Sequence, residues 1–333
     1  MNPHTSEPNW SDLAYSAAAQ ARQAAALSSL LSIAVIVPTY RRPSDLLRCL
    51  QALRTQRRPA DQLIVVMRED DEVTRAALRR TDPTDLTVVM VTTGGVVAAL
   101  NAGLQVAHAD LIAFTDDDAA PRPDWLLRTA SHFLHGAHLG GVGGRDWVHQ
   151  HGRLEEGAER TVGRITWFGR CIGNHHLGVG PPREVDALKG VNMTFRARAL
   201  AGVRFDERLR GAGAQVCNEL GVSLAVKRRG WKLLYDPQIE VDHYPARRHD
   251  VDQRNVFSEE ALYNATFNET LLLCEHFGAW RRAVYLCWAF AIGHRASPGL
   301  LQWLRLLVIE PLTAGARLRV TRRARLAGFR ASR

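Results

Sequence analysis

Apolar and amphipathic segments begin to alternate regularly at residue 33. Residues 33–37 form a continuous apolar run that Pro38 closes, which is typical of a parallel strand buried on both faces. Residues 45–53 follow with apolar positions at helical spacing. The same alternation predicts further strands at 62–67, 86–91 and 111–114, and helices at 74–80 and 96–107. Strands and helices in this succession predict βαβ units on a parallel sheet.

The alternation stops after about residue 136. Residues 136–190 are rich in Gly and His and have no clear period. Beyond them the pattern predicts a short helix around 197–201, a helix over 219–229, a last strand at 232–235 and a helical tail from 257 to 319. We therefore expect an α/β fold, with a mostly parallel sheet flanked by helices and a C-terminal helical appendage. The expected parts are a leader or helix at 1–31, a catalytic domain at 32–250 and a helical region with a basic tail at 251–333.

Composition narrows the expected compartment and partners. The 333 residues are 46% hydrophobic, which is enough for a sizeable core. Five scattered cysteines without a CxxC spacing favour a reducing cytoplasm, and the N-terminus shows no secretory-signal pattern. The formal net charge is +9, and arginines crowd the end of the chain between Arg317 and Arg333. Such a tail usually stays solvated or contacts an acidic surface such as phospholipid headgroups. Since no aromatic recognition motif accompanies it, we expect no nucleic-acid partner.

Acidic residues follow two of the predicted strands. Asp116, Asp117 and Asp118 come directly after the strand at 111–114, and residues 69–72 follow the strand at 62–67. Both clusters are expected at the carboxyl ends of parallel strands, where the ligand crevice of such sheets lies. An isolated acidic triplet is more often a turn that caps a helix. Two clusters at one edge instead favour a divalent, oxygen-loving cation such as Mn²⁺ or Mg²⁺, with a diphosphate completing its coordination.

Short segments in a fixed order along the chain carry a resemblance to a known family. They are Ile33–Arg42, Ala99–Leu104, Phe114–Asp118, Asp186–Arg196, Cys217–Leu220 and Tyr235–Pro237. Together, over roughly residues 33–245, they resemble glycosyltransferase family 2, in its bacterial members. The resemblance implies the GT-A fold and an inverting transfer of a sugar from a nucleotide-sugar donor.

The resemblance also implies residues for the nucleotide and the metal. The pocket for the nucleotide is expected to include Pro38, Thr39, Arg41, Asp70, Asn101, Asp116 and Asp117. Glu69 is the alternative to Asp70, because the segment at 67–70 departs from the family's usual turn. In the family's DxD pair the first carboxylate, Asp116, faces the ribose and the second, Asp118, holds the metal; the sequence does not assign Asp117 within that pair. His243, after the last strand, is expected near the metal or the diphosphate.

The acceptor side rests on fewer residues. Family members often carry Glu-Asp at the start of a helix, and Asn218-Glu219 stands there in this chain. We expect Glu219 to be the base that takes the proton of the acceptor hydroxyl. The alternative is a first-turn residue that offsets the helix dipole, with Asp206 or Glu207 as the base. Contacts to the acceptor or the donor sugar are expected from Lys189, Asn192 and His176.

The sequence thus predicts an inverting, metal-dependent transferase of the hexosyltransferase type. Its donor is a UDP-, GDP- or dTDP-sugar, and its acceptor is a glycan or a lipid-linked hydroxyl in cell-wall, polysaccharide or glycolipid synthesis. The apolar runs at 283–292 and 300–309 are about half the length of a membrane-spanning helix. They are expected either to lie in a membrane interface, with the enzyme at the inner face of the cell membrane, or to pack on the catalytic domain or on a second subunit.

Two other functions remain open from the residues. A sugar-1-phosphate nucleotidyltransferase uses a similar sheet, but its Gly-rich signature is replaced here by Pro-Thr-Tyr-Arg-Arg at 38–42. A non-catalytic protein that binds a sugar or a partner on the same fold is the second alternative, because Asn218 occupies the position of the family's Glu.

Overall fold

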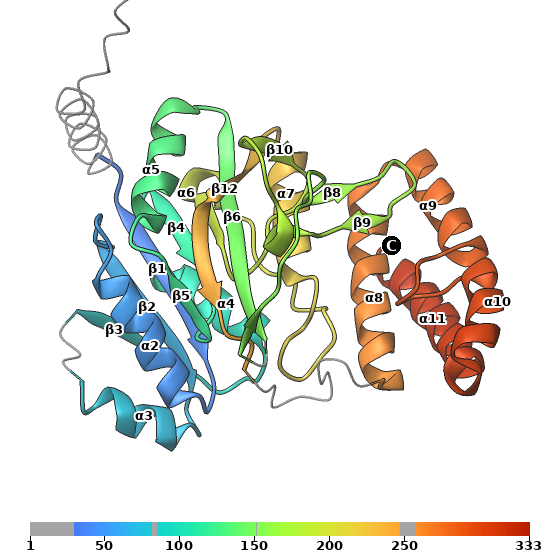
Figure 1. Ribbon diagram of the computed structural model, residues 1–333, viewed down its shortest axis with the longest axis horizontal. Coiled ribbons are helices and arrows are strands. Elements are labelled where there is room, and N and C mark those ends of the chain that lie inside the picture. The colour runs from blue at the N-terminus through green and yellow to red at the C-terminus, as the bar shows by residue number, and fades with distance from the viewer. Residues whose placement is uncertain (1–29, 82–84, 151, 247–256) are drawn as a thin grey trace, which may run out of the picture.

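The computed structural model describes residues 30–81, 85–150, 152–246 and 257–333. Almost all of the predicted leader at 1–31 lies outside these residues, as does the predicted domain boundary at 250–251. Figure 1 shows an α/β body and, beside it, a group of C-terminal helices.

The α/β body is built on a mixed sheet whose main path has the order β10-β12-β6-β11-β4-β1-β2-β3. The first four strands, all parallel, are β1 (Ile33–Thr39), β2 (Gln62–Arg68), β3 (Leu86–Val91) and β4 (Leu111–Phe114). The helices between and after them are α2 (Pro43–Arg54), α3 (Glu72–Leu78), α4 (Val96–Val106) and α5 (Trp125–His135). The predicted alternation over residues 33–114 is therefore confirmed, and so is the predicted fold class.

The second half of the sheet contains a long strand that the sequence analysis missed. Residues predicted to have no period include β6 (Leu139–Gln150), which pairs with β12 in parallel and with β11 (Met193–Arg196) antiparallel. Its first residues are mostly glycine, which is rare in strands. A Cβ at Gly144 would lie 1.9 Å from the carbonyl oxygen of Ile239, so this strand needs glycine to approach its neighbour.

Most of the remaining elements surround the second half of the sheet. β12 (Lys232–His243) extends well beyond the predicted strand and brings His243 to the carboxyl end of β4. α6 (Ala197–Leu200) and α7 (Asn218–Arg228) match the predicted helices within one residue at each end. The short elements are β5 (Ala119–Pro121), β7 (Arg153–Leu154), β8 (Arg164–Ile165), β9 (Cys171–Ile172), the 3-10 turn η1 (His175–Leu177) and β10 (Arg183–Val185).

The hydrophobic core lies on both faces of the sheet. Alternate residues of β1 point to opposite sides: Ile36 packs in the cluster shared with α4 and α7, and Val35 packs in the cluster shared with α2 and α5. The first cluster continues into the C-terminal helices through Leu271. Burial on both faces explains why the central strands read as unbroken apolar runs.

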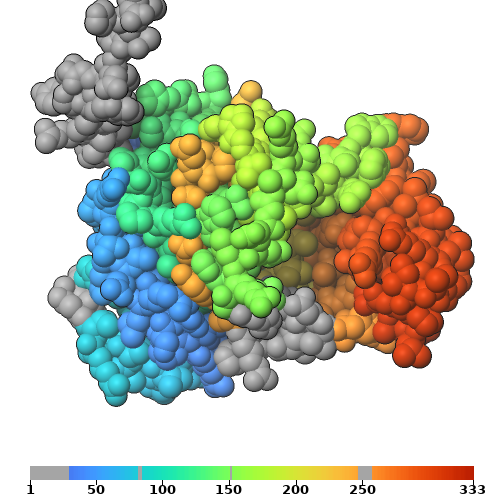
Figure 2. All heavy atoms as spheres, viewed as in Figure 1, coloured from blue at the N-terminus to red at the C-terminus, as the bar shows by residue number. Residues whose placement is uncertain are grey.

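Four helices form the C-terminal unit: α8 (Glu259–His276), α9 (Ala279–Ala291), α10 (Leu300–Ile309) and α11 (Pro311–Ala331). In Figure 2 they form an orange and red lobe, and the surface is hollowed between this lobe and the yellow-green atoms beside it. The predicted basic tail forms the helix α11. Arg325 is buried there and donates to the carbonyl oxygens of Ser297 and Pro298. Among the described helices, none has the length and apolar character needed to cross a membrane.

Candidate functional site

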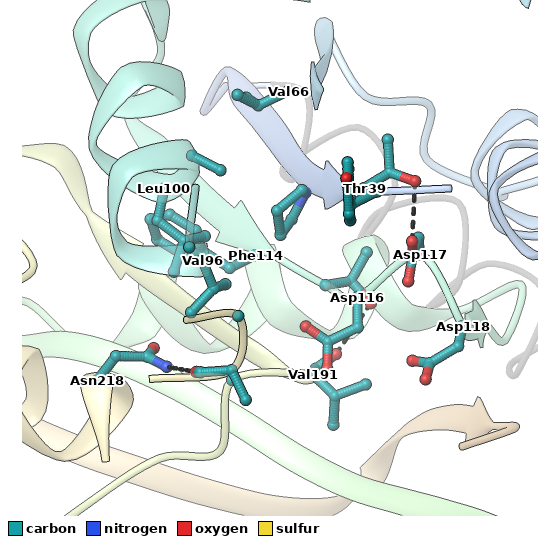
Figure 3. Close-up of a pocket in the computed structure, with 18 of the residues that line it drawn as sticks. Thr39, Val66, Val96, Leu100, Phe114, Asp116, Asp117, Asp118, Val191 and Asn218 are labelled. Carbon is teal, nitrogen blue, oxygen red and sulfur yellow. Dashed lines mark hydrogen bonds between the residues drawn. The ribbon is translucent and has the colours of Figure 1, made fainter. Parts of the chain in front are cut away.

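A cavity of about 340 Å³ opens at the carboxyl ends of β1, β2 and β4. Most of the residues that the sequence singled out line it. They are Pro38, Thr39, Asp116, Asp117, Asp118, Lys189, Glu219 and His243. Figure 3 shows Val96, Leu100 and Phe114 gathered on one side of this cavity and the aspartates on the other. The cavity thus joins an apolar wall to an acidic one.

Five of the predicted site residues are not among those that line the cavity. They are Arg41, Asp70, Asn101, Asn192 and His176. Both asparagines are buried and their amides hold the chain together. Asn101 exchanges two hydrogen bonds of 2.9 Å with the backbone of Phe205. Asn192 donates to the carbonyl oxygens of Arg145 and Ile239 and accepts from Trp125 Nε1 at 2.9 Å. Their amides thus connect parts of the chain that are distant in sequence, and their predicted contacts with the ligands stay predictions.

The other three lie nearer the surface. Asp70 Oδ2 is 2.9 Å from Arg68 Nη2, which belongs to the cavity wall, and 3.9 Å from Arg41 Nη2. Its neighbour Asp71 is buried and caps α3 by accepting from Thr74 N at 3.1 Å. His176 Nε2 faces Glu155 at 3.3 Å. The predicted roles of Arg41, Asp70 and His176 in ligand binding stay predictions.

The three consecutive aspartates point in different directions. Asp117 points toward β1, where it accepts hydrogen bonds from Thr39 Oγ1 at 2.8 Å and Arg42 Nη1 at 3.0 Å. Burial, with a contribution from the Asp118 carboxylate, raises the pKa of Asp117 to about 7, even though Arg42 opposes the shift. The carboxylates of Asp116 and Asp118 point to the opposite side, toward Val191 (Figure 3). Asp117 therefore anchors the triplet, and its neighbours are left to face the cavity.

Asp116, Asp118 and His243 offer ligand atoms that all lie within 4.8 Å of one another. Several of the polar atoms here are buried without a hydrogen-bond partner: Asp118 Oδ1 and both ring nitrogens of His243. Such atoms are costly unless a ligand satisfies them. Two carboxylates and an imidazole form a donor set that suits a divalent cation such as Mn²⁺, so these residues fit a metal site.

The charges around this cluster compensate one another. His243 Nε2 lies 3.3 Å from Asp118 Oδ1. Although burial opposes both charges, the imidazole lowers the pKa of Asp118, and the carboxylates of Asp118 and Asp146 raise the pKa of His243. A bound cation would replace the proton of His243 as the positive partner of Asp118.

Asp146 is a site residue that the sequence analysis did not identify. It lies on β6, is fully buried, and its Oδ2 is 3.5 Å from His243 Nδ1. The same oxygen forms an ion pair with Lys189, which lines the cavity. A carboxylate behind a ligating histidine fixes which ring nitrogen faces the metal. The glycine-rich run at 139–144, read as a closely packed strand, is the signal that would have pointed to it.

Glu219 lies in the first turn of α7, as predicted, and lines the cavity together with Asn218. The amide of Asn218 donates to the carbonyl oxygen of Gln215 at 3.2 Å, so it holds the turn before the helix. That turn is unusual, because Gln215 and Cys217 both have positive φ, at 39° and 72°. The strained backbone sets the direction in which the first turn of α7 faces the cavity.

The loop before α7 is held from both sides. Gly213 O accepts a hydrogen bond from Val96 N at 2.8 Å, at the start of α4. On the other side, Asn268 of α8 donates to the carbonyl oxygens of Arg210 and Val216 and accepts from Arg210 N. These three bonds are 2.8–2.9 Å long, and Asn268 is fully buried. The C-terminal helices therefore support the wall of the cavity that carries Glu219.

Comparison with known proteins points in one direction. Residues 34–207, which are more than half of the chain, match the model of the family described as glycosyl transferase family 2. Glycosyltransferase AglE of Haloferax volcanii is 29% identical over 109 residues, which are 31% of this chain and 36% of that protein. The chain thus matches about a third of the length of this curated relative.

Solved structures share the fold over a larger part of the chain. A mannosyltransferase from Pyrobaculum calidifontis, in complex with GDP-Man and Mn²⁺, has a TM-score of 0.52 at 17% identity and covers 95% of this chain and 98% of its own. GalNAc-T7, with UDP, GalNAc and Mn²⁺, has a TM-score of 0.56 at 13% identity and covers 86% of this chain and 59% of its own. At these identities the likeness shows a shared GT-A fold.

Proposed function

The chain belongs to glycosyl transferase family 2, and from that premise we propose that it is an inverting, metal-dependent hexosyltransferase. Its donor is a nucleotide-sugar and its acceptor is a hydroxyl group. The observation that carries the proposal is that one cavity holds both the Asp116–Asp118–His243 cluster and the carboxylate of Glu219. A transferase needs these two features together, one for the leaving diphosphate and one for the incoming hydroxyl.

The residues divide the work as follows in this proposal. Asp116, Asp118 and His243 would hold a divalent cation, and the cation would supply positive charge for the leaving diphosphate. Lys189 adds a second positive charge at the cavity wall. The acceptor oxygen attacks C1 of the sugar from the face opposite the diphosphate, and the C1–oxygen bond to the diphosphate breaks. Glu219 takes the proton of the acceptor hydroxyl as the new bond forms.

We propose a UDP-, GDP- or dTDP-sugar as the donor and Mn²⁺ or Mg²⁺ as the cation. Support comes from the two structural neighbours, whose complexes contain GDP-Man with Mn²⁺ and UDP with GalNAc and Mn²⁺. We propose that the acceptor belongs to a cell-surface glycan or a glycolipid.

A thermal-shift panel tests the donor half of this proposal. UDP, GDP, dTDP and CDP are each added to the full chain with and without Mn²⁺. A nucleotide that binds only the folded state adds about 2.7 kcal/mol to the free energy of unfolding at a hundredfold excess over Kd. We expect one nucleotide to raise Tm, and only when Mn²⁺ is present. A panel in which no nucleotide shifts Tm would favour a non-catalytic protein on the same fold.

The Glu219→Gln variant tests the catalytic half. Glutamine keeps the size of the side chain but cannot take a proton, so transfer should slow by about 10²–10⁴-fold while the Tm shift with nucleotide and Mn²⁺ is retained. Glu207→Gln is the matched control, because Glu207 is the alternative base and lies outside the residues that line the cavity. Near-normal transfer by Glu219→Gln, or a larger loss in the control, would show that the base is assigned wrongly.

A further inference from the structure

The outer side of the C-terminal unit exposes an unusual number of large apolar side chains. Between residues 300 and 312 seven of them face solvent, and Val308 and Leu312 are 85% and 99% exposed. The seven are Leu300, Leu301, Leu304, Leu307, Val308, Ile309 and Leu312. Scattered single residues of this kind are ordinary, whereas a contiguous group marks an interaction surface. We call these seven residues the apolar ridge.

The helix α10, which carries most of the apolar ridge, has apolar residues on its exposed side as well as on its buried side. At 100° per residue, Leu300, Leu304 and Val308 share one face of α10, and Leu306 on the opposite face is buried against the rest of the unit. α10 is thus apolar on both sides. The solvent-facing side of a surface helix normally carries polar residues. The apolar outer side of α10 is therefore suited to contact with another apolar surface.

The charge around the apolar ridge is strongly one-sided. Residues 279–333 contain eleven arginines and a single acidic residue, Glu310, which gives them a formal charge of +10. The rest of the chain is therefore close to neutral. Glu310 is already paired with Arg295 and Arg317. The outer face of α11 adds the exposed residues Arg319, Arg322 and Arg323, and none of them pairs with a carboxylate in the described part of the chain. This unit is complementary to an acidic surface.

Two exposed tryptophans lie at one edge of the unit. Trp280 begins α9 and is 73% exposed, and Trp167 in the β8–β9 turn is 58% exposed. Arg281 joins them, since its Nε donates to the carbonyl oxygen of Trp167 at 3.1 Å. Figure 1 shows the β8–β9 hairpin reaching to α9. Tryptophan is enriched where hydrocarbon meets water, because its ring is apolar and its N–H is polar.

We propose that α9, α10 and α11 dock the protein onto an anionic lipid bilayer, with the apolar ridge in the acyl boundary and the arginines at the headgroups. None of these described helices is both long and apolar enough to span a membrane, and amphipathic helices with basic and apolar faces bind in the interface instead. Pairing of two copies through the ridge would instead bring together two units of formal charge +10, which like-charge repulsion opposes. The inference goes beyond the proposed reaction and does not depend on it.

Vesicle co-sedimentation of the full chain, without donor or acceptor, tests this surface. We expect at least about tenfold stronger binding to vesicles of phosphatidylcholine with phosphatidylglycerol than to phosphatidylcholine alone, and weaker binding at high salt. Leu301→Ser, Leu304→Ser and Val308→Ser, combined in one variant, should weaken binding to the anionic vesicles by about tenfold or more. All three side chains are exposed, so folding is expected to be retained.

Val88→Ser with Met90→Ser is the matched control, because both are exposed apolar residues on the edge strand β3, away from the unit. It should bind vesicles like the wild type. Arg319→Gln, Arg322→Gln and Arg323→Gln together should remove most of the preference for anionic lipid.

Each alternative outcome would overturn the proposal. Failure of the wild-type protein to sediment with either kind of vesicle would show that the surface does not bind lipid. A triple Ser variant that sediments like the wild type would show that the ridge is not the contact. A dimer that light scattering detects in the wild type and not in the triple Ser variant, without vesicle binding, would identify the ridge as a protein interface. The Tm shift with nucleotide and Mn²⁺ reports on the proposed reaction separately.

Discussion

The two ends of the cavity are built in different ways. At the metal end, Asp116, Asp117 and Asp118 directly follow the short buried strand β4, and Thr39 of the adjacent strand β1 holds Asp117. At the other end, Glu219 sits on a helix whose preceding loop is held by α4 on one side and by Asn268 of α8 on the other. The carboxylates at one end are thus presented by the end of a strand inside the sheet, whereas the glutamate at the other end depends on a residue of a C-terminal helix, almost 50 positions away. Substitutions at the metal end should abolish binding of the metal and the nucleotide, whereas substitutions at the Glu219 end should leave that binding intact.

The largest effect is expected from Asp118→Asn. The amide keeps the shape of the side chain but removes a negative ligand from the metal cluster. Loss of a residue behind a metal ligand typically lowers metal affinity 10–100-fold. Loss of a ligand itself should cost more, so we expect Mn²⁺ to bind more than about 100-fold more weakly. Mn²⁺ electron paramagnetic resonance and the nucleotide thermal shift measure this loss. Asp110→Asn is the control, because Asp110 lies just before β4 at its other end and bonds Ser32. Equal loss in the two variants would contradict a metal site at Asp118.

The contrast between the two ends also explains what the sequence could predict. Strands β1 to β4 are runs of Val, Ile and Leu, and their period and length identified them; the acidic triplet was then placed because strand ends converge. β6 was missed because its glycines carry no apolar signal, and Asp146 was missed with it. The hydrogen bonds from the amides of Asn101 and Asn192 to backbone that is distant in sequence were not predicted. Pairings of that kind leave no local pattern.

Two buried histidines have opposite surroundings, and one of them should make the stability of the protein depend on pH. His243 is flanked by two carboxylates, whereas buried His175, whose Nε2 lies 3.0 Å from the carbonyl oxygen of Ala187, forms no ion pair in the described part of the chain. Burial lowers the pKa of His175 to about 4. Since the unfolded chain takes up this proton near pH 6.5, the contribution to stability is complete above that pH and is lost as pH falls toward 4.

The expected loss from His175 between pH 7 and pH 5 is about 2 kcal/mol of unfolding free energy. Urea unfolding of the wild type and of His175→Gln at the two pH values measures this contribution. All other groups titrate in both proteins, so their effects cancel in the difference. Between pH 7 and pH 5, the free energy of unfolding should fall by about 2 kcal/mol more in the wild type than in His175→Gln. A difference that does not change with pH would mean that His175 is already charged or is hydrated in the folded protein.

A smaller effect is expected from Asp146→Asn, which acts behind the metal cluster. The amide keeps one oxygen near His243 but loses the charge that pairs with Lys189. Loss of an outer partner of this kind typically costs 10–100-fold in metal affinity, which calorimetry with Mn²⁺ can measure. Asp236→Asn is a control, since this buried carboxylate pairs with His132 away from the cavity. Unchanged Mn²⁺ affinity in Asp146→Asn would show that His243 is oriented by its strand alone.

Asn268→Ala is the variant that acts only on the base end of the cavity. It leaves Arg210 N and the carbonyl oxygens of Arg210 and Val216 without their partner, and unsatisfied buried groups cost about 1–3 kcal/mol. The loop should then sample more conformations and Glu219 should face the cavity less often, so we expect kcat to fall by roughly tenfold, because misplacement of a catalytic group lowers the rate. The nucleotide shift with Mn²⁺ should change little, since the proposed metal ligands Asp116, Asp118 and His243 are not part of this loop.

The control for Asn268 lies on the same helix. Asn264→Ala removes an identical side chain one turn earlier, where it is only half-buried. If stability were all that Asn268 provided, kcat measured well below Tm would equal that of the wild type, and the two variants would differ only in their Tm. A fall in kcat that persists at low temperature, with donor binding intact, would instead show that the C-terminal helices take part in positioning the base. Because the proposed lipid-docking unit includes α11, which packs on α8, docking would then bear directly on the end of the cavity that receives the acceptor.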